Sequence, residues 1–211
     1  GHREVDFTAE EILQLEKVHQ ALTIIQFKLE SQLIKRRPEF QMEDQVTLDK
    51  IDYWEECLTI DDKKHPLINT CFQTIDPTNP SELSPEEAQA VDSMLASFQE
   101  SLKLAEHINL LMKKGSMYKI YNQHLLFHGC IPLEPSGEFQ PLMIHQAHYV
   151  GRELLDFFEY HIRQAAKNKE IGDDFSTDLI WYCWRGKLSP LRGNTELIYL
   201  LKVSRNRYKV L

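Results

Sequence analysis

Two segments of the chain carry apolar residues at spacings of three and four, the period of an amphipathic helix. The first opens with Thr8 and Glu11, which form a capping-box pattern, and stops at Pro38. The second opens with the same pattern at Ser84 and Glu87 and stops before a glycine. We therefore predict two helices of more than twenty residues. Their apolar stripes are Ile12, Leu15, Val18, Leu22, Ile25, Leu29 and Leu33, and then Val91, Leu95, Phe98, Leu102, Ala105, Ile108 and Met112.

Shorter segments with β-favouring residues lie between and after these helices. Residues 50–60 lead through a polar turn to residues 65–68, which predicts a short hairpin. Residues 117–121 lead through Asn122-Gln123 to residues 125–128, which predicts a second hairpin.

The rest of the chain favours further helix. Residues 150–167 have a broad apolar side, and residues 176–178 are candidates for the cap of a short helix that carries residues 179–184. Two long amphipathic helices must bury their stripes against each other and against a sheet. We predict an α+β fold that is mainly helical, in which two long amphipathic helices accompany short β-hairpins that do not close into a full sheet.

Composition narrows the class of protein. The 211 residues are 42% hydrophobic and 27% charged, so the chain can bury a core. The net charge is −8 without a basic block, which argues against a nucleic-acid partner. No apolar run approaches the ~20 residues of a membrane helix and no signal peptide opens the chain, so we expect a cytoplasmic protein with no membrane association. Free thiols are expected for the widely spaced cysteines, Cys57, Cys71, Cys130 and Cys183.

The segment around His128 is the strongest candidate for chemistry. An apolar run ends in His128 and Gly129, as in a buried strand whose last side chain points out of its carboxyl end. Such strand ends hold ligands in open α/β sheets, and a neutral imidazole is a good metal ligand. The glycine would allow backbone or substrate to approach closely. From this segment alone, a core histidine beside a turn is the simpler interpretation.

Other candidate residues have simpler explanations. Arg185 and Lys187 lie beside three large aromatic residues and could meet a phosphate, but we assign neither a catalytic role. Three large aromatic side chains within four residues cannot all face one way, so some are expected in the core and others in a pocket or an oligomer contact, with the core as the default. No ligand role is expected for His65, His107, His145 and His148.

The segment His128-Gly129-Cys130-Ile131-Pro132 resembles the His-Gly-Gly-Leu-Ser-Pro segment of the calcineurin-like metal-dependent phosphoesterases. More widely, the chain is similar to the class III fructose-1,6-bisphosphatases of bacteria from about residue 11 to residue 191. The segments that carry this similarity are 24–30, 34–38, 50–53, 69–72, 112–116, 151–156 and 181–191.

The resemblance implies a function and a division of the chain. The family hydrolyses the 1-phosphate of fructose 1,6-bisphosphate in gluconeogenesis with manganese or magnesium, and His128 would be one ligand of its two-metal centre. The chain would be a central fragment of the α/β/β/α metallophosphatase fold. It would comprise a helical insertion with a short hairpin (1–115), a partial metallophosphatase core (116–191) and a divergent tail (192–211).

Most of the family's metal-ligand motifs have no match in this sequence. These motifs are Asp-x-His, Gly-Asp-x-x-Asp-Arg-Gly, Gly-Asn-His-Asp and, later, Asn-Gly-His-Thr-Pro. A two-metal hydrolase needs several ligands to hold its ions about 3.5–4 Å apart, and one imidazole does not define such a site. We therefore expect no stably bound metal, and we assign neither catalytic nor substrate-binding residues.

Three hypotheses follow from these observations. The first is a fragment of a fructose-1,6-bisphosphatase that is inactive alone. The second is a non-catalytic helical scaffold or oligomerisation module derived from that enzyme, and the third is an intact hydrolase with an unrecognised site. We expect self-association as a homo-oligomer, because strands without partners leave apolar edges exposed.

Overall fold

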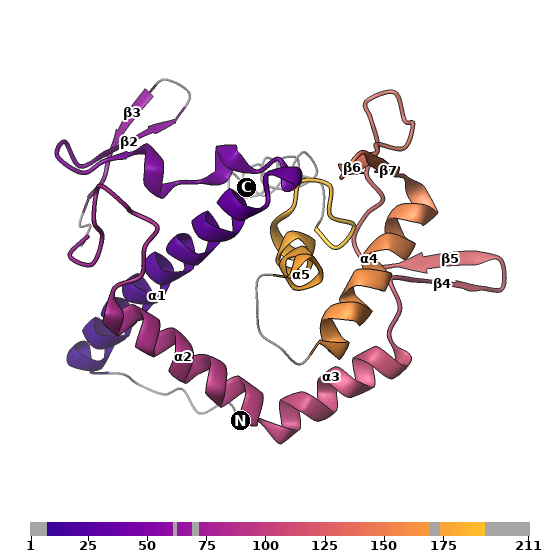
Figure 1. Cartoon of the computed structure of the whole chain (residues 1–211), viewed down its shortest axis with the longest axis horizontal. Helices are drawn as coiled ribbons and strands as arrows, with labels where there is room; N and C mark the ends of the chain where they lie inside the picture. The colour runs from indigo at the N-terminus through magenta and orange to yellow at the C-terminus, as the bar shows by residue number, and fades with distance from the viewer. Residues whose placement is uncertain (1–7, 61–62, 69–71, 169–173, 193–211) are drawn as a thin grey trace, which may run out of the picture. The chain divides into compact units, whose positions relative to one another are not determined.

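The computed structural model describes residues 8–60, 63–68, 72–168 and 174–192 (Figure 1). The chain forms two compact units, Gly1–Phe98 and Gln99–Leu211. The sequence-based division at residue 115 rests on family resemblance and not on packing, so it remains a prediction. Beyond Arg192, the predicted tail lies outside the described residues.

Helix α1 (Ala9–Arg36) confirms the first predicted helix. The Thr8 hydroxyl accepts the Glu11 N–H at 3.3 Å, and the Glu11 carboxylate accepts the Thr8 N–H at 2.8 Å, so the capping box is formed. At the other end, the Arg37 N–H donates to the Leu33 carbonyl at 3.0 Å.

The apolar stripe of α1 is buried over only part of its length. Ile25 and Leu33 are buried. The 3-10 helices η1 (Pro38–Phe40) and η3 (Leu48–Lys50) pack on α1, and η2 (Glu43–Gln45) lies between them in the chain. Over the first four turns of the helix, the side chains of this stripe are 41–46% exposed: Ile12, Leu15, Val18 and Leu22.

A buried ion pair joins α1 to α2 (Pro85–Glu100). Lys28 is fully buried, and its Nζ donates to Glu87 Oε2 at 2.7 Å and to the Thr74 carbonyl at 2.6 Å. Glu87 also accepts the Ser84 N–H at 2.8 Å, which completes the second predicted capping box. Burial would raise the pKa of Glu87, but the hydrogen bond from Lys28 and its other hydrogen bonds lower the pKa overall.

The first unit also contains a small antiparallel sheet. Strands β1 (Ile51–Asp52), β2 (Cys57–Ile60) and β3 (Lys63–Pro66) pair in that order, which confirms a hairpin in this region. Of the cysteines, Cys57, Cys130 and Cys183 are free thiols, whereas Cys71 lies outside the described residues.

The second predicted long helix is wrong as a single element, because it divides at Ser101. Helix α2 ends at Glu100 and α3 (Leu102–Lys114) begins after it. Ser101 has an extended backbone, and its side chain accepts the Leu104 N–H at 3.3 Å as the N-cap of α3. A serine that bonds its own backbone neighbours in this way competes with continuous helix. Among the described helices, only α1 therefore exceeds twenty residues.

The second unit contains two hairpins and a helix pair. Strands β4 (Tyr118–Tyr121) and β5 (His124–Phe127) pair across Asn122 and Gln123, which both have positive φ, and this confirms the predicted hairpin and its turn. Strands β6 (Leu142–Ile144) and β7 (Ala147–Tyr149) form a second hairpin. In Figure 1 the β4–β5 hairpin projects from the side of α4.

Helices α4 (Gly151–Lys167) and α5 (Phe175–Arg185) pack on each other and form the core of this unit. The Phe158 and Tyr182 rings stack with their centroids 6.1 Å apart. The predicted cap at residues 176–178 is wrong, because α5 already begins at Phe175 and Asp174 caps it by accepting the Thr177 N–H at 3.0 Å. The described residues thus combine helices with small antiparallel sheets, in agreement with the α+β prediction.

Candidate functional site

His128 follows directly after β5, as the sequence predicts, but every residue of β5 is exposed, so the prediction of a buried strand is wrong. Its side chain is exposed, so the interpretation as a core histidine is wrong. The residue after it, Gly129, turns the chain with a φ of +87°. The imidazole is therefore presented at the end of a strand, where it can reach a ligand or a metal ion.

Gly129 is required by the close approach of another segment. A Cβ atom at this position would lie 2.2 Å from the carbonyl oxygen of Pro190 and 3.2 Å from the Cα of Leu191. The next residue, Cys130, donates its N–H to the same Pro190 carbonyl at 3.0 Å, and its Sγ lies 3.1 Å from the Arg192 carbonyl oxygen. The segment that bears His128 is thus fixed on the loop after α5.

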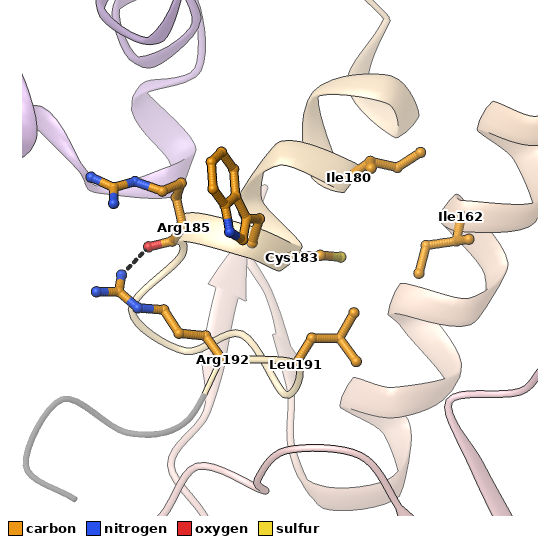
Figure 2. A pocket seen from close by; sticks show the side chains of 7 residues that line it. Ile162, Ile180, Cys183, Arg185, Leu191 and Arg192 are labelled. Carbon is orange, nitrogen blue, oxygen red and sulfur yellow. Dashed lines mark hydrogen bonds between the residues drawn. The ribbon is translucent and has the colours of Figure 1, made fainter. Parts of the chain in front are cut away.

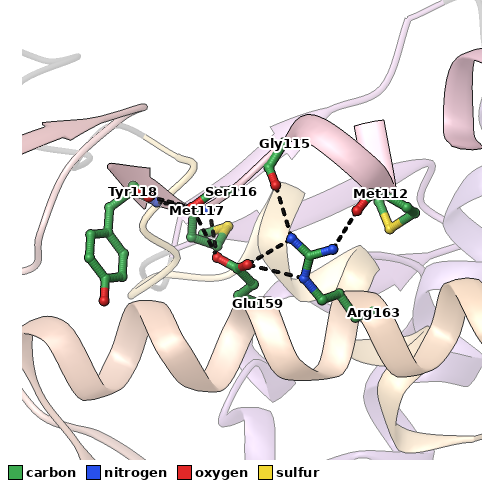
Figure 3. A network of polar contacts seen from close by, with 7 residues as sticks. All are labelled: Met112, Gly115, Ser116, Met117, Tyr118, Glu159 and Arg163. Atoms are coloured by element: carbon green, nitrogen blue, oxygen red, sulfur yellow. Dashed lines mark hydrogen bonds and ion pairs between the residues drawn. The ribbon is translucent and has the colours of Figure 1, made fainter. Parts of the chain in front are cut away.

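A polar network holds the first strand of the same hairpin at its base (Figure 3). Glu159 of α4 accepts the Met117 N–H at 3.0 Å and the Ser116 hydroxyl at 3.2 Å, just before β4. Burial would raise the pKa of Glu159, but the hydrogen bonds and the charge of Arg163 lower the pKa below its usual range.

Arg163 extends this network to the end of α3. Its guanidinium donates to Glu159 Oε1 at 2.8 Å, to the Met112 carbonyl at 2.5 Å and to the Gly115 carbonyl at 2.9 Å. These carbonyls lie at the carboxyl end of the helix, where a cation is favourable. Sequence reasoning missed both residues, although a Glu–Arg pair at i and i+4 on a helix is a visible, weak signal.

The metal-binding side chains of the described residues do not gather around His128. Their single group of three close ligand atoms is Asp52, Glu55 and Cys57, in the first unit. Glu55 in that group already pairs with Lys64. The residues described around His128 thus supply one imidazole, which does not fit a two-metal centre on its own.

The four further histidines to which the sequence assigns no ligand role are all exposed. His65 is exposed on β3 and His107 is exposed on α3. His145 lies in the β6–β7 turn with a φ of +47°, and the centroid of its ring lies 5.3 Å from that of the Phe175 ring. His148 is exposed on β7.

The aromatic residues of α5 face in different directions, as expected. Tyr182 is buried, whereas Trp184 is 65% exposed. Trp184 and Arg185 line a cavity of about 500 Å³ between α4, α5 and the loop that ends at Arg192 (Figure 2). Cys183 also lines it, but burial raises the pKa of its thiol to about 12, so the thiol is protonated at neutral pH and is a poor nucleophile.

Known proteins resemble almost the whole chain. The family model described as Firmicute fructose-1,6-bisphosphatase matches residues 2–203, so the match continues beyond Leu191, where the resemblance was expected to end. A Streptococcus gordonii protein called fructose-1,6-bisphosphatase class 3 is 96% identical over 200 residues, which is 95% of this chain and 31% of that protein.

More distant relatives bear the same name. A Streptococcus sanguinis protein is 78% identical over 200 residues, which is 95% of this chain and 31% of that protein. A Staphylococcus epidermidis protein is 51% identical over 195 residues, which is 92% of this chain and 30% of that protein. The chain therefore spans less than a third of the length of these curated relatives. No solved structure matches it. Among the described residues, no helix is both long and apolar enough to span a membrane.

Proposed function

Because this chain belongs to the Firmicute fructose-1,6-bisphosphatase family, we propose that it forms part of an enzyme that hydrolyses fructose 1,6-bisphosphate to fructose 6-phosphate and phosphate. The observation that carries this proposal is the 96% identity to a class 3 enzyme over 200 residues. The exposed position of His128 at the end of β5 supports it, because a metal ligand must reach its ion.

The chain contributes His128 as one ligand to manganese or magnesium in the family's metal centre, and further ligands come from parts of the enzyme that the chain does not span. Since one imidazole does not fit a two-metal centre, the chain alone has no hydrolase activity. In this proposal the β4–β5 hairpin belongs to the metallophosphatase core, and the enzyme works in the cytoplasm.

Phosphate release from fructose 1,6-bisphosphate tests the proposal. The chain and its His128→Ala variant are each assayed with manganese, alone and after mixing with the remaining part of the Streptococcus gordonii relative. We expect background rates for both alone, activity for the mixture with the unchanged chain, and none for the mixture with the variant. Metal-dependent turnover by the chain alone would overturn the fragment interpretation, and equal activity of the two mixtures would remove His128 from the site.

A second candidate function is a non-catalytic oligomerisation module. The observation that favours it is the exposed apolar stripe over the first four turns of α1, since an unpaired stripe of this kind is typical of helix–helix association. The variant Leu15→Glu/Leu22→Glu should then convert an oligomer to a monomer in sedimentation velocity. A monomer before the substitution would exclude this function.

A further inference from the structure

The cavity beside α5 has an apolar end and a cationic end. Ile162, Ile180 and Leu191 line the apolar end, and Arg185 and Arg192 line the other. Figure 2 shows both guanidinium groups pointing to the same side, away from Ile162 and Leu191. A volume of about 500 Å³ is within the range of small-molecule sites.

The cationic end stands out against the charge of the protein. Arg185, Lys187 and Arg192 occur within eight residues, and no acidic residue occurs between Leu179 and Arg192, whereas the whole chain carries a net charge of −8. Arg192 donates one N–H to the Arg185 carbonyl at the end of α5. A guanidinium has five donors, so this bond leaves the fork of Arg192 with capacity for an anion.

The aromatic side chain at the cavity suits the body of a small ligand. Trp184 is 65% exposed although it is large and apolar. Trp184 and the apolar wall offer contact area for the carbon face of a sugar, while a guanidinium group can form two parallel hydrogen bonds to a phosphate.

The same loop contacts the segment that bears His128. Pro190 and Leu191 meet Gly129 so closely that a Cβ atom does not fit, and Cys130 bonds to Pro190 and Arg192. The cationic loop and the strand end with His128 are therefore parts of one packed arrangement in the second unit.

We propose that Arg185 and Arg192 bind one phosphate group of a sugar bisphosphate, with Trp184 and the apolar wall against the sugar. This assignment rests on the proposed function, because it places the phosphate that is not hydrolysed beside the strand end that carries the metal ligand.

Binding to the 211-residue chain tests the site without any turnover. Isothermal titration in metal-free buffer compares fructose 1,6-bisphosphate, fructose 6-phosphate and inorganic phosphate. We expect fructose 1,6-bisphosphate to bind more tightly than inorganic phosphate, because the sugar adds contacts. The variants Arg185→Gln and Arg192→Gln should each weaken the sugar bisphosphate about tenfold or more, since charge-assisted hydrogen bonds to phosphate are strong. Lys103→Gln, which removes an exposed charge from α3, should leave binding unchanged.

Several results would overturn the proposal. The first is that the chain does not bind the sugar bisphosphate. The second is that the two arginine variants bind it as tightly as the unchanged chain, and the third is that inorganic phosphate binds as tightly as the sugar bisphosphate. Circular dichroism first establishes that each variant is folded, and Arg192→Gln decides the question if Arg185→Gln is not. If the arginine variants weaken binding but the mixture of the chain with the rest of the enzyme shows no hydrolysis, the hydrolase function is removed and the phosphate site is kept. If the mixture hydrolyses the substrate but neither arginine variant weakens binding, the hydrolase function is kept and the phosphate site is removed.

Discussion

The α4–α5 pair and the β4–β5 hairpin belong to the same unit, but they are stabilised in opposite ways. The helix pair buries Leu154, Phe158, Leu179 and Tyr182 to an exposure of 1% or less. In the hairpin every strand residue except Tyr118 is exposed, including three consecutive apolar residues, Leu125 to Phe127. An isolated two-stranded hairpin is marginally stable in water. The hairpin therefore depends on what holds its base.

Two contacts at the base of the hairpin supply this support. Glu159 binds the backbone just before β4, and Pro190 meets Gly129 just after β5. Both partners of the hairpin come from the helix pair or the loop that follows it. The position of His128 is therefore set by the buried helix pair and its loop through a few contacts, and not by packing of the strands that carry it.

The largest expected effect is the loss of a core ring. Phe158→Ala should lower the free energy of unfolding by about 3–5 kcal/mol, because it removes a fully buried aromatic side chain and leaves a cavity. Leu126→Ala, at a hairpin position that is 54% exposed, should change it by less than about 0.5 kcal/mol. Denaturation in urea, followed by circular dichroism, measures both. Similar losses for the two variants would mean that the hairpin is as well packed as the helix pair.

The next largest effect is expected from a substitution at the contact after β5, which can be tested by comparing two glycines. Gly129 and Gly137 have φ values of +87° and +90°, but a Cβ would meet the Pro190 backbone at 2.2 Å at the first position and nothing within 4 Å at the second. Gly137→Ala should lower the free energy of unfolding by about 1 kcal/mol, because of its backbone conformation alone. Gly129→Ala should cost more, about 2–4 kcal/mol, because the loop must also move. Thermal unfolding compares them, and equal costs would show that the close approach to Pro190 is not important.

Much of the fold could be predicted from local sequence signals. The capping boxes at Thr8 and Ser84, the stop at Pro38 and the Asn122-Gln123 turn all depend on residues within a few positions of each other, and the structure confirms each of them. The break at Ser101 was missed because the apolar stripe continues through it. Periodicity alone does not distinguish one helix from two that follow each other.

The candidate site could be predicted only in part. His128 at a strand end and the need for glycine at 129 were readable, because both are properties of one short segment. The partners of that segment were not, since Pro190 lies some sixty residues away and Glu159 meets Met117 across more than forty. Contacts at such separations leave no local pattern in one sequence.

Acid should loosen the hairpin before it loosens the helix pair. The pKa of Glu159 is lowered in the folded protein, so its contribution is complete above the unfolded value of about 4.3 and is lost as the pH falls through the folded value. Amide hydrogen exchange of residues 117–121 should therefore rise ahead of exchange in α4 as the pH falls below the unfolded value. Glu159→Gln should raise that exchange already at pH 7, because it lowers the free energy of local opening of the hairpin by about 1–2 kcal/mol. The exchange of residues 117–121 in this variant should no longer rise in acid. Exchange in 117–121 that does not respond to the variant would show that the base does not hold the hairpin.

Substitutions of the exposed apolar residues of β5 should have the smallest effect on stability but the largest effect on self-association. Leu125, Leu126 and Phe127 are 43–54% exposed on a hairpin that pairs with no further strand among the described residues, which favours self-association through edge pairing or apolar contact. Replacing Leu125 and Leu126 by Thr keeps β propensity and removes apolar area, so the free energy of unfolding should change by less than about 0.5 kcal/mol. Sedimentation velocity at increasing concentration should show the unchanged chain associating and the double variant associating less. Met94→Thr, at a similarly exposed position on α2, is the control for apolar area elsewhere. If that control dissociates the oligomer and the hairpin variant does not, the helices form the interface and the open hairpin edge does not drive association.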